Sequence, residues 1–132
     1  MTSVDTNVVI RMLVDDDPAQ VSVVRSLVDR GPIWIAKTVL LETAWALRSI
    51  YGFEQSAIRE ALEKLVRMDN VQVENQASVV LSLALMANGI DVADAMHLAS
   101  TPPDSSFASF DQVLVRRARR AGLSQVFDPS QS

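Results

Sequence analysis

The sequence contains no cysteine and a single histidine, and these absences narrow the chemistry open to the protein. Without thiols, a disulfide framework, a thiolate zinc site and a cysteine nucleophile are excluded, and one histidine excludes a multi-histidine metal centre. Any metal site in this protein would therefore be built mainly from oxygen ligands. The sequence also lacks an apolar run long enough to cross a membrane, and its first residues, MTSVDTN, form no basic or apolar leader segment. We therefore expect a cytoplasmic protein with no membrane association.

An excess of positive charge is also missing, because the formal net charge is -4 at pH 7. This balance argues against a protein that binds nucleic acid mainly through an overall positive field. The same charge balance does not exclude an enzyme whose metal ions and local arginines contact the phosphates of a nucleic acid. The chain has 132 residues with no repeat and no low-complexity linker, so we expect one domain over residues 1–132.

Short apolar segments alternate with helical patterns along the chain. Helices are predicted from Val8, from Pro18 to Arg30, from an N-cap at Thr38 to Ile50, and over 54–68, 76–88, 91–100 and 112–121. Strands are predicted at 2–5, in GPIWIA, at 71–73, at 105–110 and at 125–127. Because parallel neighbours need crossover connections, this order favours an α/β fold, a three-layer α/β/α sandwich around a central, mostly parallel sheet.

Four acidic residues fall where such a fold forms sites. Asp5 and Asp111 each follow a predicted strand, at the carboxyl end where open parallel sheets bind ligands. Glu42 lies on a narrow polar stripe of an otherwise apolar helix, and Asp94 lies in the first turn of the 91–100 helix. Other roles stay open at this point: N-capping for Asp5, Asp111 and Asp91, the N3 position of a capping box for Asp94, and an arginine partner for Glu42.

Carboxylates that meet in one place repel one another, by roughly 4 kcal/mol per pair at about 4 Å and an effective dielectric near 20. They take up protons or bind cations in response. Magnesium accepts carboxylate oxygens and operates on phosphate substrates, and four carboxylates are enough for one ion or two. The residues alone therefore indicate a divalent metal site that acts on phosphodiesters.

Four ordered segments, which cover nearly the whole chain, resemble the PIN-domain endoribonucleases and in particular the VapC-like toxins of type II toxin–antitoxin systems. The segments are VDTNVVIRMLVDDDPAQ, TVLLETAWALRSIYG, GIDVADAMHLA and FASFDQVLVRRARRAG. The resemblance implies that Asp5, Glu42, Asp94 and Asp111 form the catalytic, metal-binding quartet. It further implies Mg2+ or Mn2+, an RNA substrate, a homodimer and a VapB-like antitoxin.

The same resemblance implies supporting roles around the acids. Asn7 is expected to organise the site by hydrogen bonding, Ser109 stands where the family usually has threonine, and Thr6 and Asp91 are expected beside them. Weaker candidates for RNA phosphate contacts are Arg11, Lys37, Arg48 and Arg116.

Hydrolysis by water activated on the metal predicts products with 5'-phosphate and 3'-hydroxyl ends. The alternative is a catalytically silent RNA-binding or protein-interaction module on the same fold. The aromatic residues Trp34, Trp45, Phe107 and Phe110 lie in apolar patterns, which predicts that they pack in the core, as does His97.

Overall fold

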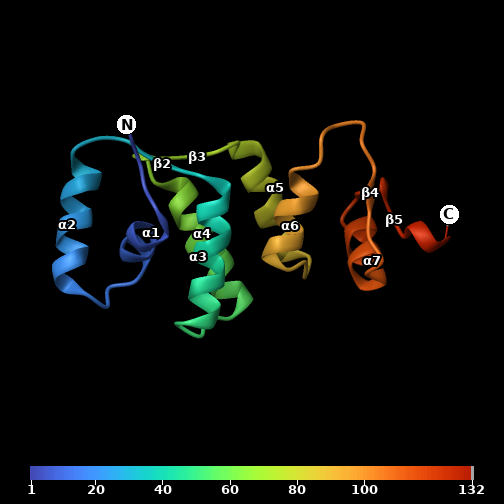
Figure 1. Ribbon diagram of the computed structural model, residues 1–132, viewed down its shortest axis with the longest axis horizontal. Helices are drawn as coiled ribbons and strands as arrows, with labels where there is room; N and C mark the ends of the chain where they lie inside the picture. Colours follow the sequence, from blue (N-terminus) through green and yellow to red (C-terminus); the bar gives the residue numbers. More distant parts are fainter. Residues whose placement is uncertain (132) are drawn as a thin grey trace. The chain divides into compact units, whose positions relative to one another are not determined.

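The structure is a computed structural model that describes residues 1–131, so the last residue of the predicted single domain, Ser132, lies outside the described residues. The chain divides into two compact units, the first Met1–Gln76 and the second beginning at Ala77. Figure 1 labels the helices and strands of both units. Each unit is described by itself below. The single domain stays a prediction.

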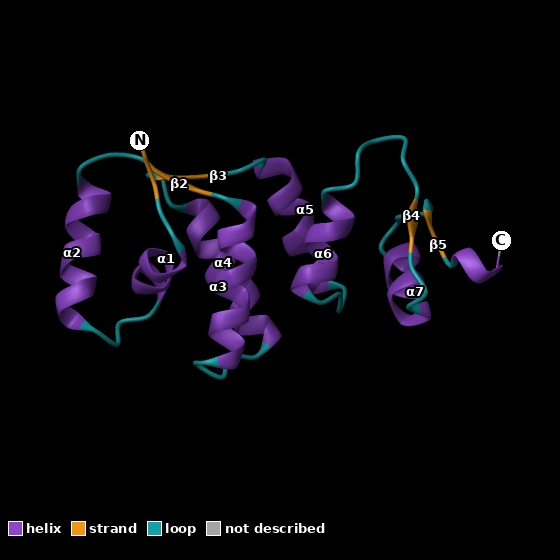
Figure 2. Ribbon diagram, in the orientation of Figure 1, coloured by secondary structure: helices purple, strands orange, loops and turns teal. Residues whose placement is uncertain are grey.

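The first unit is built on a parallel sheet. Strands β1 (Thr2–Ser3), β2 (Ile33–Ile35) and β3 (Val71–Val73) lie in the order β1-β2-β3, and both strand pairs are parallel. Helices α1 (Thr6–Leu13) and α2 (Pro18–Asp29) connect β1 to β2, and α3 (Lys37–Ser49) and α4 (Gln55–Arg67) connect β2 to β3 (Figure 2). The predicted α/β fold, with a parallel sheet flanked by helices, is confirmed.

The core of this unit lies between the central strand and the helices. Ile33 and Ile35 of β2 are fully buried, and so are Leu40 and Leu47 of α3. Helix α4 buries one apolar stripe, with Ile58, Leu62 and Leu65 at most 1% exposed. This packing fixes α3, which carries Glu42. Val9 of α1 is also fully buried, which fixes the helix that follows Asp5.

The second unit repeats the alternation of helix and strand. It contains nearly all of α5 (Gln76–Ala87), then α6 (Val92–Ala99), β4 (Phe107–Ala108), α7 (Gln112–Arg120), β5 (Val126–Phe127) and a 3-10 turn, Pro129–Gln131. Strands β4 and β5 are parallel, with Phe107 opposite Val126. The Ser78 hydroxyl donates to the Ala99 carbonyl at 2.9 Å and joins α5 to the end of α6.

Two helices begin two residues earlier than the sequence predicts. Thr38 is not the N-cap of α3, because the helix begins at Lys37 after Ala36, which makes no side-chain capping bond. Glu74, in the loop after β3, accepts a hydrogen bond from the Lys37 backbone N–H at 3.0 Å, so a distant residue caps this helix. Helix α1 begins at Thr6, two residues before Val8, because Asp5 caps it.

Helix α3 ends at Ser49 with Ile50, the predicted last residue, as its C-cap. Gly52 has a φ of +70°, and its N–H donates to the Arg48 carbonyl at 3.1 Å.

Among the described residues, no helix combines the length and the apolar character needed to span a bilayer.

Candidate functional site

Asp5 lies two residues beyond the carboxyl end of β1 and is the N-cap of α1. Its backbone is extended, and its Oδ1 accepts a hydrogen bond from the Val8 N–H at 3.2 Å. The capping role that the sequence left open is therefore present. The residue is exposed, and this bond occupies only one carboxylate oxygen, so the second oxygen can still meet a ligand.

Glu42 meets the start of α1 through a hydrogen bond. The Thr6 hydroxyl donates to Glu42 Oε1, which ties the first turn of α1 to the middle of α3. Arg48, the arginine considered as a partner for Glu42, donates to Gln55 Oε1 at 3.1 Å. The structure thus brings Asp5 and Glu42 to one place, although they lie on different elements.

That place is a surface hollow of about 270 Å³, which we call the acidic hollow. It is lined by Asp5, Thr6, Asn7, Ile10, Glu42, Trp45, Ala46 and Ile50. Among the described residues, this lining includes two carboxylates and no lysine or arginine. The negative charge is therefore uncompensated by the lining, which favours binding of a cation.

Asp111 in the second unit repeats the arrangement of Asp5. It follows β4, it is the N-cap of α7, and its Oδ1 accepts from the Leu114 N–H at 3.1 Å. The Asp111 N–H donates to Ser109 Oγ at 3.0 Å, so the predicted supporting hydroxyl fixes the backbone that carries the acid. As with Asp5, one carboxylate oxygen is left for a ligand.

The other two predicted acids of the second unit lie at the start of α6. Asp91 is its N-cap and accepts from the Ala93 N–H at 3.3 Å. Asp94 lies in the first helical turn and is half-buried, while Ala95 beside it is fully buried. The helix dipole favours a carboxylate at this position.

The predicted quartet is therefore divided between the units. Asp5 and Glu42 line the acidic hollow of the first, and Asp94 and Asp111 begin two helices of the second. Within residues 1–131, no three histidine, aspartate or glutamate side chains are arranged to hold a metal ion. The four-residue metal site stays a prediction.

Arg11, one of the predicted RNA contacts, is engaged in a network inside the first unit. Its guanidinium lies 2.6 Å from Asp16 Oδ1 and also donates to Gln20 Oε1 at 2.7 Å and to the Tyr51 hydroxyl at 3.2 Å. Tyr51 in turn donates to Asp16 at 2.9 Å. The bond to Tyr51, followed by the charge of Asp16, raises the pKa of Arg11.

The other predicted basic contacts differ in their surroundings. Lys37 is half-buried at the start of α3, whereas Arg48 and Arg116 are exposed. Two neighbours of Arg116 bind backbone carbonyls: Arg117 donates to Gly89 at 2.6 Å and Arg119 to Val126 at 2.8 Å. These two arginines of the RRARR segment therefore stabilise the second unit itself.

The prediction that the aromatic side chains pack in the core is wrong for two of them. Trp45 is 62% exposed and Phe110 is 77% exposed, while Trp34 and Phe107 are half-buried. Helix α3 buries Leu40, Thr43, Ala44 and Leu47 instead, which leaves Trp45 on the same side as Glu42. His97, also expected to be packed, is exposed.

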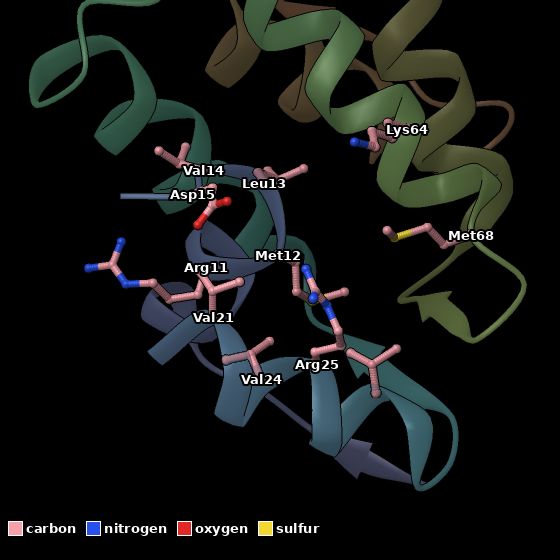
Figure 3. A pocket seen from close by; sticks show the side chains of 11 residues that line it. Arg11, Met12, Leu13, Val14, Asp15, Val21, Val24, Arg25, Lys64 and Met68 are labelled. Atoms are coloured by element: carbon pink, nitrogen blue, oxygen red, sulfur yellow. The ribbon is translucent and has the colours of Figure 1, made fainter. Parts of the chain in front are cut away.

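A second hollow of the first unit, about 340 Å³ in volume, lies apart from the predicted acids. Figure 3 shows Arg25 and Met12 on one side, and Lys64 of α4 and Met68, the C-cap of α4, on the other. Its lining is mostly apolar, and the only predicted site residue in it is Arg11. We therefore take the acidic hollow as the candidate site of this unit.

Comparison with known proteins gives one positive result. The model of the PIN domain family matches residues 3–119, a span that includes all four predicted acids. Neither a curated protein nor a solved structure matched the chain.

Proposed function

The chain belongs to the PIN domain family, and we propose that it is a metal-dependent endoribonuclease whose acidic site comprises Asp5, Glu42, Asp94 and Asp111. The observation that carries the proposal is the acidic hollow, where Asp5 and Glu42 meet without a lysine or arginine in the lining. The match of the family to residues 3–119 supports the inclusion of Asp94 and Asp111 from the second unit.

The donor atoms fit a hard divalent cation. Asp5 and Asp111 each commit one oxygen to a helix cap and keep the other, and Glu42 is exposed beside Asp5. Carboxylate oxygens of this kind suit Mg2+ or Mn2+. When bound, the ion would supply positive charge to the phosphate and lower the pKa of a coordinated water.

The side chains of the chain position the reaction. The capping bonds hold Asp5 and Asp111 at the starts of their helices, and Thr6 holds Glu42 by one oxygen. We assign Glu42 to orient the attacking water with its second oxygen. In-line attack on phosphorus then displaces the ribose 3'-oxygen, so the products carry 5'-phosphate and 3'-hydroxyl ends. Asn7, which is exposed and also lines the acidic hollow, is assigned to hydrogen bonding near these acids.

At the level of physiology, we propose a toxin of the VapC type that acts on RNA as a homodimer and is neutralised by a VapB-like antitoxin. The four sequence segments that resemble these toxins support this role. The second candidate is a catalytically silent RNA-binding or protein-interaction module.

Cleavage assays separate the two candidates. The purified chain is incubated with single-stranded RNA in Mg2+, in Mn2+ and in EDTA, and the ends of the products are mapped. We expect cleavage with either metal, none in EDTA, and 5'-phosphate ends. RNA binding without cleavage supports the silent module, and 2',3'-cyclic phosphate ends contradict the hydrolytic route.

A matched pair of substitutions tests the site. Asp17 is the N-cap of α2, where its Oδ1 accepts from the Gln20 N–H at 3.2 Å, as Asp5 does for α1. Asp17 does not line the acidic hollow. Asparagine caps helices as well as aspartate does, so both Asp5→Asn and Asp17→Asn should fold. We expect Asp5→Asn to abolish cleavage and Asp17→Asn to leave it unchanged.

A further inference from the structure

Trp45 is exposed, although its neighbours on helix α3 are buried. Its side chain is 62% exposed, whereas Ala44 and Ala46 on either side are at most 4% exposed and Leu47 is fully buried. Tryptophan has a large apolar ring system and is usually well covered by other residues. An exposed indole therefore needs an explanation.

Its place in the first unit suggests one. Trp45 lies one helical turn after Glu42, and both residues line the acidic hollow together with Asp5. Ile50, five residues farther along the chain, lines the same hollow and is 67% exposed. The hollow thus combines a carboxylate pair with an exposed apolar rim.

This combination fits a nucleotide of single-stranded RNA. The carboxylates repel a phosphate, so a bound cation would be needed to hold the phosphate beside them. No lysine or arginine lines the hollow to bind the phosphate directly. The base beside that phosphate needs an apolar surface, and an indole face stacks on any base. Bases in a duplex are already stacked, so only an unpaired base can use it.

We propose that Trp45 stacks on an unpaired base next to the phosphodiester bond that the enzyme cleaves. The inference rests on the proposed ribonuclease function, and it adds a residue that binds substrate. Trp45 therefore contributes to KM and to the preference for single-stranded RNA, while the acids determine kcat.

Kinetics test the proposal. Loss of one base–aromatic stack weakens binding roughly 5- to 150-fold, so we expect Trp45→Ala to raise KM by that factor with little change in kcat. Trp45→Phe keeps an aromatic face and should recover most of the loss. Val80→Ala, at a residue of α5 that is 50% exposed, is the control and should behave as the unsubstituted protein.

Fluorescence tests the contact itself and does not depend on turnover. The chain has two tryptophans, so Trp34→Phe leaves Trp45 as the only indole. With Ca2+ in place of Mg2+, we expect single-stranded RNA to quench the fluorescence emission of Trp45. An abasic oligonucleotide of the same length should quench this emission much less.

The possible failures are distinguishable. Cleavage with an unchanged KM in Trp45→Ala overturns the stacking role and leaves the nuclease intact. If Trp45→Ala also changes the oligomeric state in size-exclusion chromatography while KM is unchanged, Trp45 belongs to an interface between copies. An unsubstituted protein that never cleaves RNA refutes the proposed function, and the quenching experiment then still shows whether the indole contacts a base.

Discussion

The carboxylate of Asp5 caps α1 and lines the acidic hollow, and two substitutions separate these roles. Asp5→Ala removes the oxygen that accepts from the Val8 N–H at 3.2 Å, and loss of such a cap costs about 1 kcal/mol, within a range of about 0.5–2 kcal/mol. Asp5→Asn keeps an accepting oxygen and costs close to nothing. Because Asp5 is exposed, no cavity penalty adds to either value.

Urea and thermal unfolding measure the first role, and RNA cleavage measures the second. For a chain of this size, a loss of about 1 kcal/mol lowers the Tm by roughly 3–5 °C, so Asp5→Ala should melt lower by that amount and Asp5→Asn should not. Both variants should lose cleavage, because each removes the charge. Equal destabilisation by the two substitutions would refute the capping role, and cleavage by Asp5→Asn would refute the catalytic one.

Three further predictions concern stability. Leu47 is fully buried in α3, so Leu47→Ala should cost about 2–5 kcal/mol in urea unfolding, and a smaller loss would show that the site collapses around the cavity. Gly52 has a φ of +70° with nothing within 4 Å of an added Cβ, so Gly52→Ala should cost about 1–2 kcal/mol from backbone strain alone. Hydrogen bonds from the Ser130 hydroxyl and then from the Ser130 N–H lower the pKa of Asp128 from its ordinary value of about 3.9. The charged Asp128 carboxylate therefore stabilises the fold at pH values above about 3.9, and this stabilisation is lost as the pH falls through the lowered pKa. Ser130→Ala should therefore raise the pKa of Asp128 in an NMR titration and destabilise the protein near neutral pH but not in strong acid; an unchanged pKa would contradict this.

Local signals in the sequence predict most of the elements. The VQV segment is β3 as expected, and proline begins α2 at the predicted residue. The capping interpretations of Asp5, Asp91 and Asp111 are all confirmed, because a cap depends on a side chain and an N–H only two or three residues away. Signals of this range are contained in the sequence itself.

Features that depend on tertiary contacts could not be predicted in the same way. The residue that caps α3 is Glu74, which follows α4 and β3 in the sequence. The hydrogen bond from Thr6 to Glu42 likewise joins two different helices. The exposure of Trp45 also escaped prediction, because an apolar pattern does not tell which of several apolar faces the rest of the chain covers. The sequence did favour Asp5 and Glu42 as partners, from their positions and from the family resemblance.

Direct measurement of metal binding tests whether acids from both units hold one divalent site. Calorimetric titration with Mn2+ is carried out on the unsubstituted protein, on Asp5→Asn of the first unit, on Asp111→Asn of the second, and on Asp17→Asn as the control. We expect Asp5→Asn and Asp111→Asn each to weaken binding by at least about tenfold, the effect of about 1.4 kcal/mol, and Asp17→Asn to leave it unchanged. Binding of Mn2+ that is as tight in Asp5→Asn and Asp111→Asn as in the unsubstituted protein would contradict a shared metal site.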